Sequence, residues 1–107
     1  MMKPKIQKIE KEQLKECAFK KPAYESSEHD LSERNKNLYL AMLMGNNYES
    51  KVKIVFNTLD GYREILTTVW ATTEKFILLK GGSHIPLEAI ALVELDNNSK
   101  QNANYIF

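Results

Sequence analysis

The stretch that decides the fold is GGSHIPLEAIALVEL, residues 81–95. Gly-Gly-Ser is a turn signal, and His84-Ile85 is long enough only for a very short strand before Pro86, which lacks the amide that a sheet ladder needs. LEAI then allows one helical turn, and ALVEL returns to an apolar strand. A short strand, a proline, a single turn and a last strand are together typical of a small closed sheet.

Three further strands are expected before this stretch. Apolar and polar residues alternate over 51–57, and Asp60-Gly61 is a strong hairpin signal. The next strand, 62–71, carries apolar residues on both faces, so it is either sandwiched or bent. KFILLK (75–80) is typical of a short buried strand. Closing these strands into a five-stranded barrel would remove exposed sheet edges. The predicted core consists of Ile54, Phe56, Val69, Leu78, Ile90 and Val93.

Two helices are expected on the N-terminal side of the strands. Pro4 and a thin apolar stripe predict a marginal helix over 4–18, followed by a linker rich in proline, serine and charge. Asp30 and Glu33 form a capping-box pattern, and Gly45 is a stop signal, so a second helix is predicted over 31–44. Its C-terminal half, LYLAMLM, is apolar on nearly every side, and we expect it to pack on the barrel through Leu38, Met42 and Leu43.

Length and composition fit one soluble domain. The chain has 107 residues, of which 43% are apolar and 27% charged. No apolar run approaches the ~20 residues of a membrane-spanning helix, and the N-terminus lacks the apolar stretch of a secretory signal. We therefore expect a cytoplasmic protein that does not bind a membrane. The predicted parts are a charged N-terminal arm or linker with a marginal helix (1–29), a helix with a small barrel (30–95) and a polar tail (96–107). The polar composition of the tail favours disorder, whereas its apolar tip would suit a docking peptide.

The charge distribution argues against a dedicated nucleic-acid domain. Residues 1–21 hold seven lysines against three glutamates, a net +4, whereas residues 22–50 carry a net −3 and residues 51–95 are neutral. Phosphate neutralisation provides most of the affinity of nucleic-acid domains, which are therefore usually basic. The predicted barrel has no such excess.

The pattern resembles the small β-barrels of the SH3-like and Sm-like kind. The resemblance covers roughly residues 31–95 and depends on three features: a helix ahead of the first strand, the LDG turn (59–61) and IPLEAI (85–90) ahead of the last strand. TTVWATTEKFILLKGG (67–82) is also similar to small bacterial proteins of unknown function, of the Bacteroidetes type. The resemblance implies a mainly β, α+β fold and supplies no activity.

Sm-like proteins read RNA with two elements, of which this chain has one. Lys80-Gly81 resembles the Arg/Lys-Gly pair before the last strand, but the Asp/Asn pair is missing from the preceding loop, where Thr72-Thr73-Glu74 stands. The candidate binding surface is Lys80, Gly81, Gly82, Ser83 and His84, together with Lys51 and Lys53. The candidate basic arm is Lys3, Lys5, Lys8, Lys11 and Lys15.

The sequence offers no catalytic residue, metal site or cofactor site. Cys17 is the only cysteine, and His29 and His84 have no carboxylates at a ligand spacing around them. Gly81-Gly82 precedes an extended segment, whereas phosphate-binding glycines precede a helix. Trp70 shares a strand face with Tyr62 at a spacing that favours core packing over base stacking.

Two functions remain. The first is a non-enzymatic binding or scaffolding module that contacts a protein partner or another copy of itself, and the second is an RNA-binding barrel with a basic arm. RNA binding is expected to be weak, and no small-molecule substrate is evident. An enzyme is the least favoured class, because no nucleophile, base and stabiliser converge.

Overall fold

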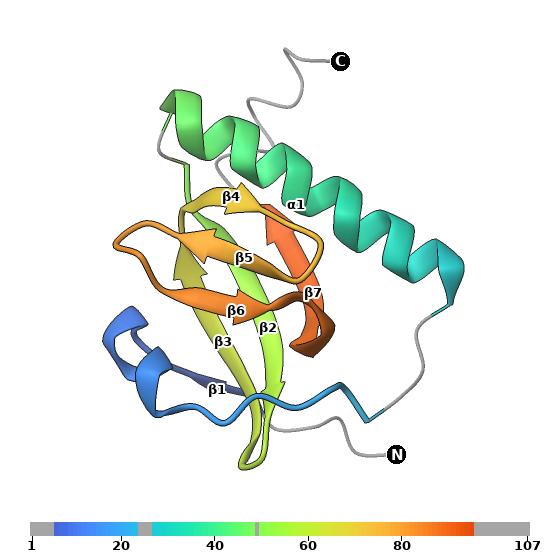
Figure 1. Ribbon diagram of the computed structural model, residues 1–107, viewed down its shortest axis with the longest axis vertical. Coiled ribbons are helices and arrows are strands. Elements are labelled where there is room, and N and C mark those ends of the chain that lie inside the picture. Colours follow the sequence, from blue (N-terminus) through green and yellow to red (C-terminus); the bar gives the residue numbers. More distant parts are fainter. Residues whose placement is uncertain (1–5, 24–26, 49, 96–107) are drawn as a thin grey trace.

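The computed structural model describes residues 6–23, 27–48 and 50–95 (Figure 1), and of residues 47 and 48 it describes the backbone only. In this part of the chain the protein is mixed α+β, with one long helix and seven strands in two sheets. The elements are β1 (Ile6–Lys8), the 3₁₀ helix η1 (Lys11–Glu16), α1 (Glu28–Tyr48), β2 (Val52–Thr58), β3 (Gly61–Thr67), β4 (Val69–Thr72), β5 (Phe76–Leu79), β6 (His84–Pro86), the 3₁₀ helix η2 (Leu87–Ala89) and β7 (Ile90–Leu95).

The strands form a four-stranded sheet, β1-β3-β2-β7, and a three-stranded sheet, β4-β5-β6. Figure 1 shows the smaller sheet in front of the larger one, with α1 passing across one end of both. All pairs are antiparallel except β1 with β3. The pairing therefore gives two open sheets among the described residues, where we predicted five strands closed into one barrel.

The predicted strand over 62–71 is bent, which explains why both of its faces are apolar. It divides at Thr68 into β3 and β4, which belong to different sheets. The predicted hairpin is present, but its turn residues are Leu59 and Asp60, one position earlier than predicted, and Gly61 is the first residue of β3, paired with Thr58. Gly61 has a φ of 115°, a region that favours glycine. The short strand, the helical turn and the last strand predicted from residues 81–95 are also present as β6, η2 and β7.

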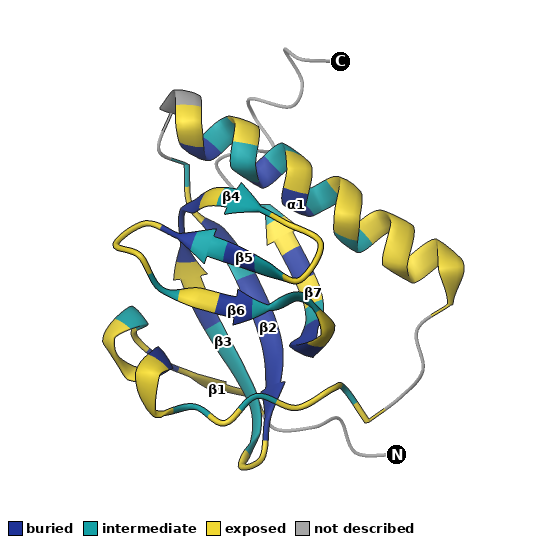
Figure 2. Ribbon diagram, viewed as in Figure 1, coloured by how far each residue is buried: buried dark blue, intermediate teal, exposed yellow. Residues whose placement is uncertain are grey.

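The core lies between the two sheets (Figure 2). Ile54, Phe56, Val69, Ile90 and Val93 are buried in one cluster, as predicted. The prediction of Leu78 is wrong: successive residues of a strand point to opposite faces, and on β5 the buried pair is Ile77 and Leu79. Trp70, predicted as a core residue, is also exposed.

Helix α1 begins earlier and ends later than predicted. Its first turn is closed by a reciprocal pair in which the amide of Asp30 donates to Ser27 Oγ at 3.1 Å and the amide of Ser27 donates to Asp30 Oδ2 at 3.4 Å. Asp30 is thus the third helical residue of a capping box, whereas we had placed it at the cap itself. At the other end the helix continues past Gly45 to Tyr48.

A glycine is required at position 45 because α1 comes very close to β4 there. The prediction that Gly45 ends the helix is wrong. A Cβ placed on Gly45 would lie 2.5 Å from the carbonyl oxygen of Val69 and 2.9 Å from Cγ2 of Thr68. The helix can rest directly on the start of β4 because this residue has no side chain. Leu38 is buried and Met42 packs against the core, as predicted, but Leu43 is exposed and Ala41 is buried instead.

The N-terminal segment is part of the packed structure. The helix predicted over 4–18 is replaced by β1 and η1, because β1 pairs with the edge of β3 and tertiary contacts override a weak helix preference. Ile9 and Leu14 belong to the core cluster. Phe19 forms a bridge with Thr58, and its ring lies 5.6 Å from that of Phe56. A segment that we expected to be an arm therefore contributes to the core.

Candidate functional site: the outer face of the four-stranded sheet

One face of the four-stranded sheet points away from the core. Directly opposed residues share a face, so the register of β2 with its two neighbours defines its centre. Val55, at this centre, is only 5% exposed although it lies outside the core cluster. We call this surface the outer face; its members are Ile6 and Lys8 on β1, Tyr62, Glu64 and Leu66 on β3, Lys53, Val55 and Asn57 on β2, and Leu92 and Glu94 on β7.

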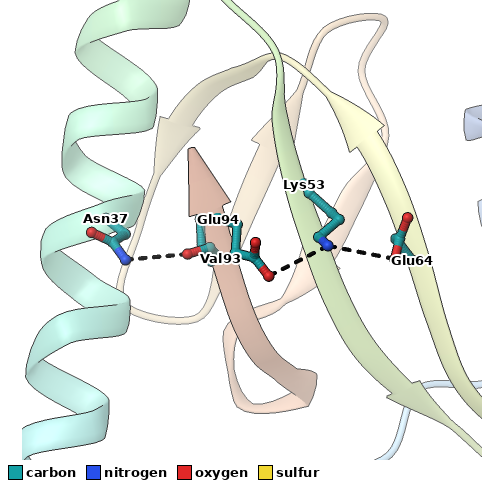
Figure 3. A network of polar contacts seen from close by, with 5 residues as sticks. All are labelled: Asn37, Lys53, Glu64, Val93 and Glu94. Atoms are coloured by element: carbon teal, nitrogen blue, oxygen red, sulfur yellow. Dashed lines mark hydrogen bonds and ion pairs between the residues drawn. The ribbon is translucent and has the colours of Figure 1, made fainter. Parts of the chain in front are cut away.

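Lys53 lies at the middle of a charged network on the outer face. Its Nζ is 3.4 Å from Oε1 of Glu94 and 3.9 Å from Oε1 of Glu64, on the strands to either side (Figure 3). These side chains are partly exposed, so each pair contributes little stability. The network nevertheless neutralises Lys53, which we had predicted as a candidate binding residue.

The network is flanked by apolar side chains. Ile6, Leu66 and Leu92 are 44%, 44% and 45% exposed, and they lie on three different strands of this one face. The smaller sheet covers the opposite face, and α1 packs on β4 and along β7. Of the described residues, none covers these three side chains fully. The outer face thus combines exposed apolar side chains with balanced charge.

The predicted surface at residues 80–84 lies elsewhere, in the turn between β5 and β6. Gly81 and Gly82 both have a φ of 97°, and the amide of Gly82 donates to the carbonyl of Leu79 at 2.9 Å. The His84 ring stands edge-on to Phe76 with centroids 4.9 Å apart. This turn belongs to the three-stranded sheet, so the structure separates it from Lys53. Lys51 is exposed just before β2.

The predicted basic arm is divided among different surfaces. Lys8 lies on the outer face, Lys15 is exposed on η1, and Lys3 and Lys5 lie outside the described residues. Lys11 extends to the β5–β6 turn, where its Nζ lies 3.2 Å from the position that a Cβ on Gly81 would take. The structure therefore joins one lysine of the arm to the turn, a contact that sequence spacing does not indicate.

The nucleophilic and metal-ligating side chains do not converge in the described chain. Across residues 6–23, 27–48 and 50–95 no group of three or more histidine, cysteine or acidic residues is placed to hold a metal ion. Partial burial raises the pKa of the Cys17 thiol, against an opposing effect of Arg63. A raised pKa makes the thiolate scarcer at neutral pH, which disfavours a nucleophilic role.

Sequence reasoning missed a cleft beside α1. It has a volume of about 860 Å³ and is walled by residues 21–23, the N-terminal half of α1, the β4–β5 turn and η2. Arg34 lines it and donates from Nη1 to the carbonyl oxygen of Leu87 at 3.2 Å. In the sequence Arg34 is one charged residue in a polar helical turn, so nothing in the pattern distinguishes it.

The chain matches no known protein family, no curated protein and no solved structure. No helix in the described part of the chain combines the length and apolar character needed to cross a membrane. The tail predicted over 96–107 lies outside the described residues.

Proposed function

We propose that the protein is a non-enzymatic binding and scaffolding module that acts through protein contacts, and that a second copy of the chain binds the outer face. The observation that carries this proposal is the set of three exposed apolar side chains, Ile6, Leu66 and Leu92, on a face with a neutral charge network. A two-fold interface must be complementary to itself. Lys8 and Lys53 against Glu64 and Glu94 give the outer face both signs of charge in equal number.

The size of the outer face sets the expected strength of association. Four strands about 4.8 Å apart and about six residues long cover roughly 300–400 Å² in projection, which is small beside the ~800 Å² per partner of a standard interface. We therefore expect weak association, with a Kd of roughly 10 µM to 1 mM. The neutral charge of the outer face also favours a protein over a polyanion as the binding partner, because Lys53 is already paired with two carboxylates.

Sedimentation velocity over a range of protein concentrations tests this proposal. The full chain should show a reversible monomer–dimer equilibrium, and Leu66→Asp with Leu92→Asp should abolish the dimer by placing charge at the centre of the contact. Leu59→Asp is the matched control, since Leu59 is an exposed leucine on the β2–β3 turn, away from the outer face. A chain that stays monomeric up to 1 mM, or a dimer that survives the double substitution, would contradict the proposal.

RNA binding is the second candidate, and one contact favours it. Lys11 lies against Gly81, so a lysine of the predicted arm and the Lys80-Gly81 turn form one basic surface. Each phosphate contact on a single strand contributes about 0.7 to the logarithmic salt slope, so four or five contacts by the predicted arm would give a slope near −3. Because the structure places Lys8 and Lys15 away from the Lys11–Gly81 contact, we expect weak binding with a slope shallower than −3.

Substitution tests RNA binding better than truncation does, because Ile9 and Leu14 of the N-terminal segment are in the core. Labelled single-stranded RNA is titrated at several salt concentrations with the native chain and with a variant in which Lys3, Lys5, Lys8, Lys11 and Lys15 are all replaced by glutamine. The variant should lose most of the binding. Tight binding that survives both the substitution and raised salt would indicate the 80–84 turn as an RNA site and overturn the preference for protein contacts.

We also propose that the fold is related to the SH3-like and Sm-like small barrels. The bend at Thr68, which carries one strand from the first sheet into the second, supports this relation. The 3₁₀ turn η2 directly ahead of β7 supports it as well.

A further inference from the structure

The cleft beside α1 continues into a second groove along the edge of the four-stranded sheet. The second groove has a volume of about 320 Å³ and lies between α1 and β7. The two hollows share Leu31, Arg34 and Ile90, so they form one elongated depression, which we call the α1 groove. Both hollows are partly open to solvent, which suits an extended chain better than a small molecule, whose site usually encloses most of the ligand.

Arg34 lies at the junction of the two hollows with its charge uncompensated by a carboxylate. Its Nη1 donates to the Leu87 carbonyl at 3.2 Å, and its Nε and Nη2 donate to Oδ1 of Asn35 at 3.3 and 3.2 Å. Among the described residues no carboxylate lies within ion-pair distance of it. The guanidinium is partly buried, and this desolvation lowers its pKa from the usual value, although arginine stays protonated. A carboxylate placed here would replace lost hydration with a charge-assisted hydrogen bond.

The remaining charges of the α1 groove differ between its two ends. At the wide end Lys21 pairs with Glu88 at 3.9 Å, and Lys75 offsets Glu74, so Arg34 leaves this end with a net +1. At the narrow end the other charged residues are Asp30 and Glu33, which give a net −2 when Arg34 is counted at the wide end. A bound chain would therefore place its acidic group at the wide end. A long polyanion such as RNA would be repelled at the narrow end.

One wall of the α1 groove is an edge strand. In the described sheet β7 pairs with β2 alone, and its other edge faces α1. Asn37 Nδ2 donates to the Val93 carbonyl at 3.1 Å, which joins the helix to the edge and closes the narrow end (Figure 3). Between Ile90 and this contact an extended segment has a strand edge on one side and Leu31 on the other. Sheet edges and apolar pockets of this kind are a known means of recognising extended peptides.

We infer that the α1 groove binds an extended peptide segment of a partner protein that carries one aspartate or glutamate between apolar residues. Arg34 binds the carboxylate from the wide end. Leu31, Leu87 and Ile90 contact the apolar neighbours. The α1 groove borders the outer face and shares Leu92 with it. Leu31, Arg34 and Leu87 lie outside the outer face, so peptide binding does not depend on self-association.

The test selects a random ten-residue peptide library displayed on phage against the full chain, and measures the enriched peptides as synthetic fluorescent probes. Enriched sequences should share an acidic residue with apolar neighbours, and replacing that residue by its amide should weaken binding roughly tenfold or more. Arg34→Gln should weaken binding by a similar factor, and the two changes together should weaken it little further. Leu31→Ser provides a second variant at a partly exposed position, so its loss of binding does not depend on a folding defect.

Arg63→Gln is the matched control, because Arg63 is the other arginine of the chain and also donates to backbone carbonyls, those of Tyr62 and Asp60, outside the α1 groove. It should leave peptide affinity unchanged. Circular dichroism melts of each variant report whether it is folded. The inference is overturned if no peptide is enriched, if enriched peptides lack an acidic residue, or if Arg34→Gln folds and binds them as the native chain does.

Discussion

Replacing Gly45 by alanine has two opposing effects on the free energy of unfolding, and the structure shows which effect is larger. Alanine is favoured over glycine inside a helix by about 1 kcal/mol, so helix propensity alone predicts a more stable protein. The added Cβ, however, would lie 2.5 Å from the carbonyl oxygen of Val69 and 2.9 Å from Thr68 Cγ2. The first of these atoms belongs to the backbone of β4 and cannot rotate away.

Relief of this contact requires α1 and β4 to separate by roughly 0.7 Å or more. Overpacking of this kind typically costs 1–3 kcal/mol, and a backbone neighbour places Gly45→Ala at or above the upper end of that range. After the gain of about 1 kcal/mol in helix propensity we expect a net loss of about 2 kcal/mol or more in the free energy of unfolding. This is a large fraction of the 5–15 kcal/mol that stabilises a typical domain.

Urea denaturation followed by circular dichroism measures this loss. With an m-value of roughly 1–2 kcal/mol/M, the midpoint for Gly45→Ala should fall by about 1 M or more. Asn46→Ala is the control, since Asn46 is the next residue of the same helix and is exposed, so only the propensity gain applies and stability should change by less than about 0.5 kcal/mol. If Gly45→Ala is as stable as the native chain, the close approach of α1 to β4 is wrong.

Three further outcomes are expected. Phe56→Ala should cost about 3–5 kcal/mol in urea denaturation, because the ring is fully buried and contacts Phe19; a loss under ~1 kcal/mol would mean that the faces of β2 are misassigned. Lys53→Met should change stability by less than about 1 kcal/mol, because its ion pairs are partly exposed, and a larger loss would show that the network is structural. Burial raises the pKa of Cys17, so iodoacetamide should alkylate it more slowly in the folded chain than in urea at pH 8. The native state holds this proton longer than the unfolded state does, so the contribution of Cys17 to stability should fall as pH rises through and above about 9.

Local patterns predicted the strands well and the contacts between distant segments poorly. The strand β2, the hairpin that follows it and the single turn at η2 each depend on a few neighbouring residues, and all three are present. Gly45 was predicted to end the helix because glycine often does so, but its role depends on β4, more than twenty residues away. The helix predicted over 4–18 is wrong for a similar reason, because the strand that pairs with this segment, β3, is far along the chain.

The candidate sites show the same limit. Lys53 was identified as a candidate from its charge, but its two carboxylate neighbours come from β3 and β7, and only the strand register shows that they neutralise it. The sequence does not identify Arg34 as a site residue, because the α1 groove forms only where η2 and residues 21–23 come together beside the helix. A lone arginine in a polar helical turn has the same sequence appearance whether it faces solvent or a groove.

The N-terminal segment lies along both sides of the β2–β3 hairpin. Ile6 pairs with Tyr62 at one edge, and at the other the amide of Lys20 donates to the carbonyl of Asn57. During synthesis this segment leaves the ribosome first but has no strand to pair with until the hairpin follows it. The segment can cover the edge of β3 as soon as the hairpin forms, whereas the edge of β2 over 52–56 stays bare until β7 is synthesised. Bare edges are where chains join one another, and a weakened β1 would leave both edges of the hairpin bare during this time. Substitutions that weaken β1 should therefore lower the yield of folded protein more than they lower its final stability.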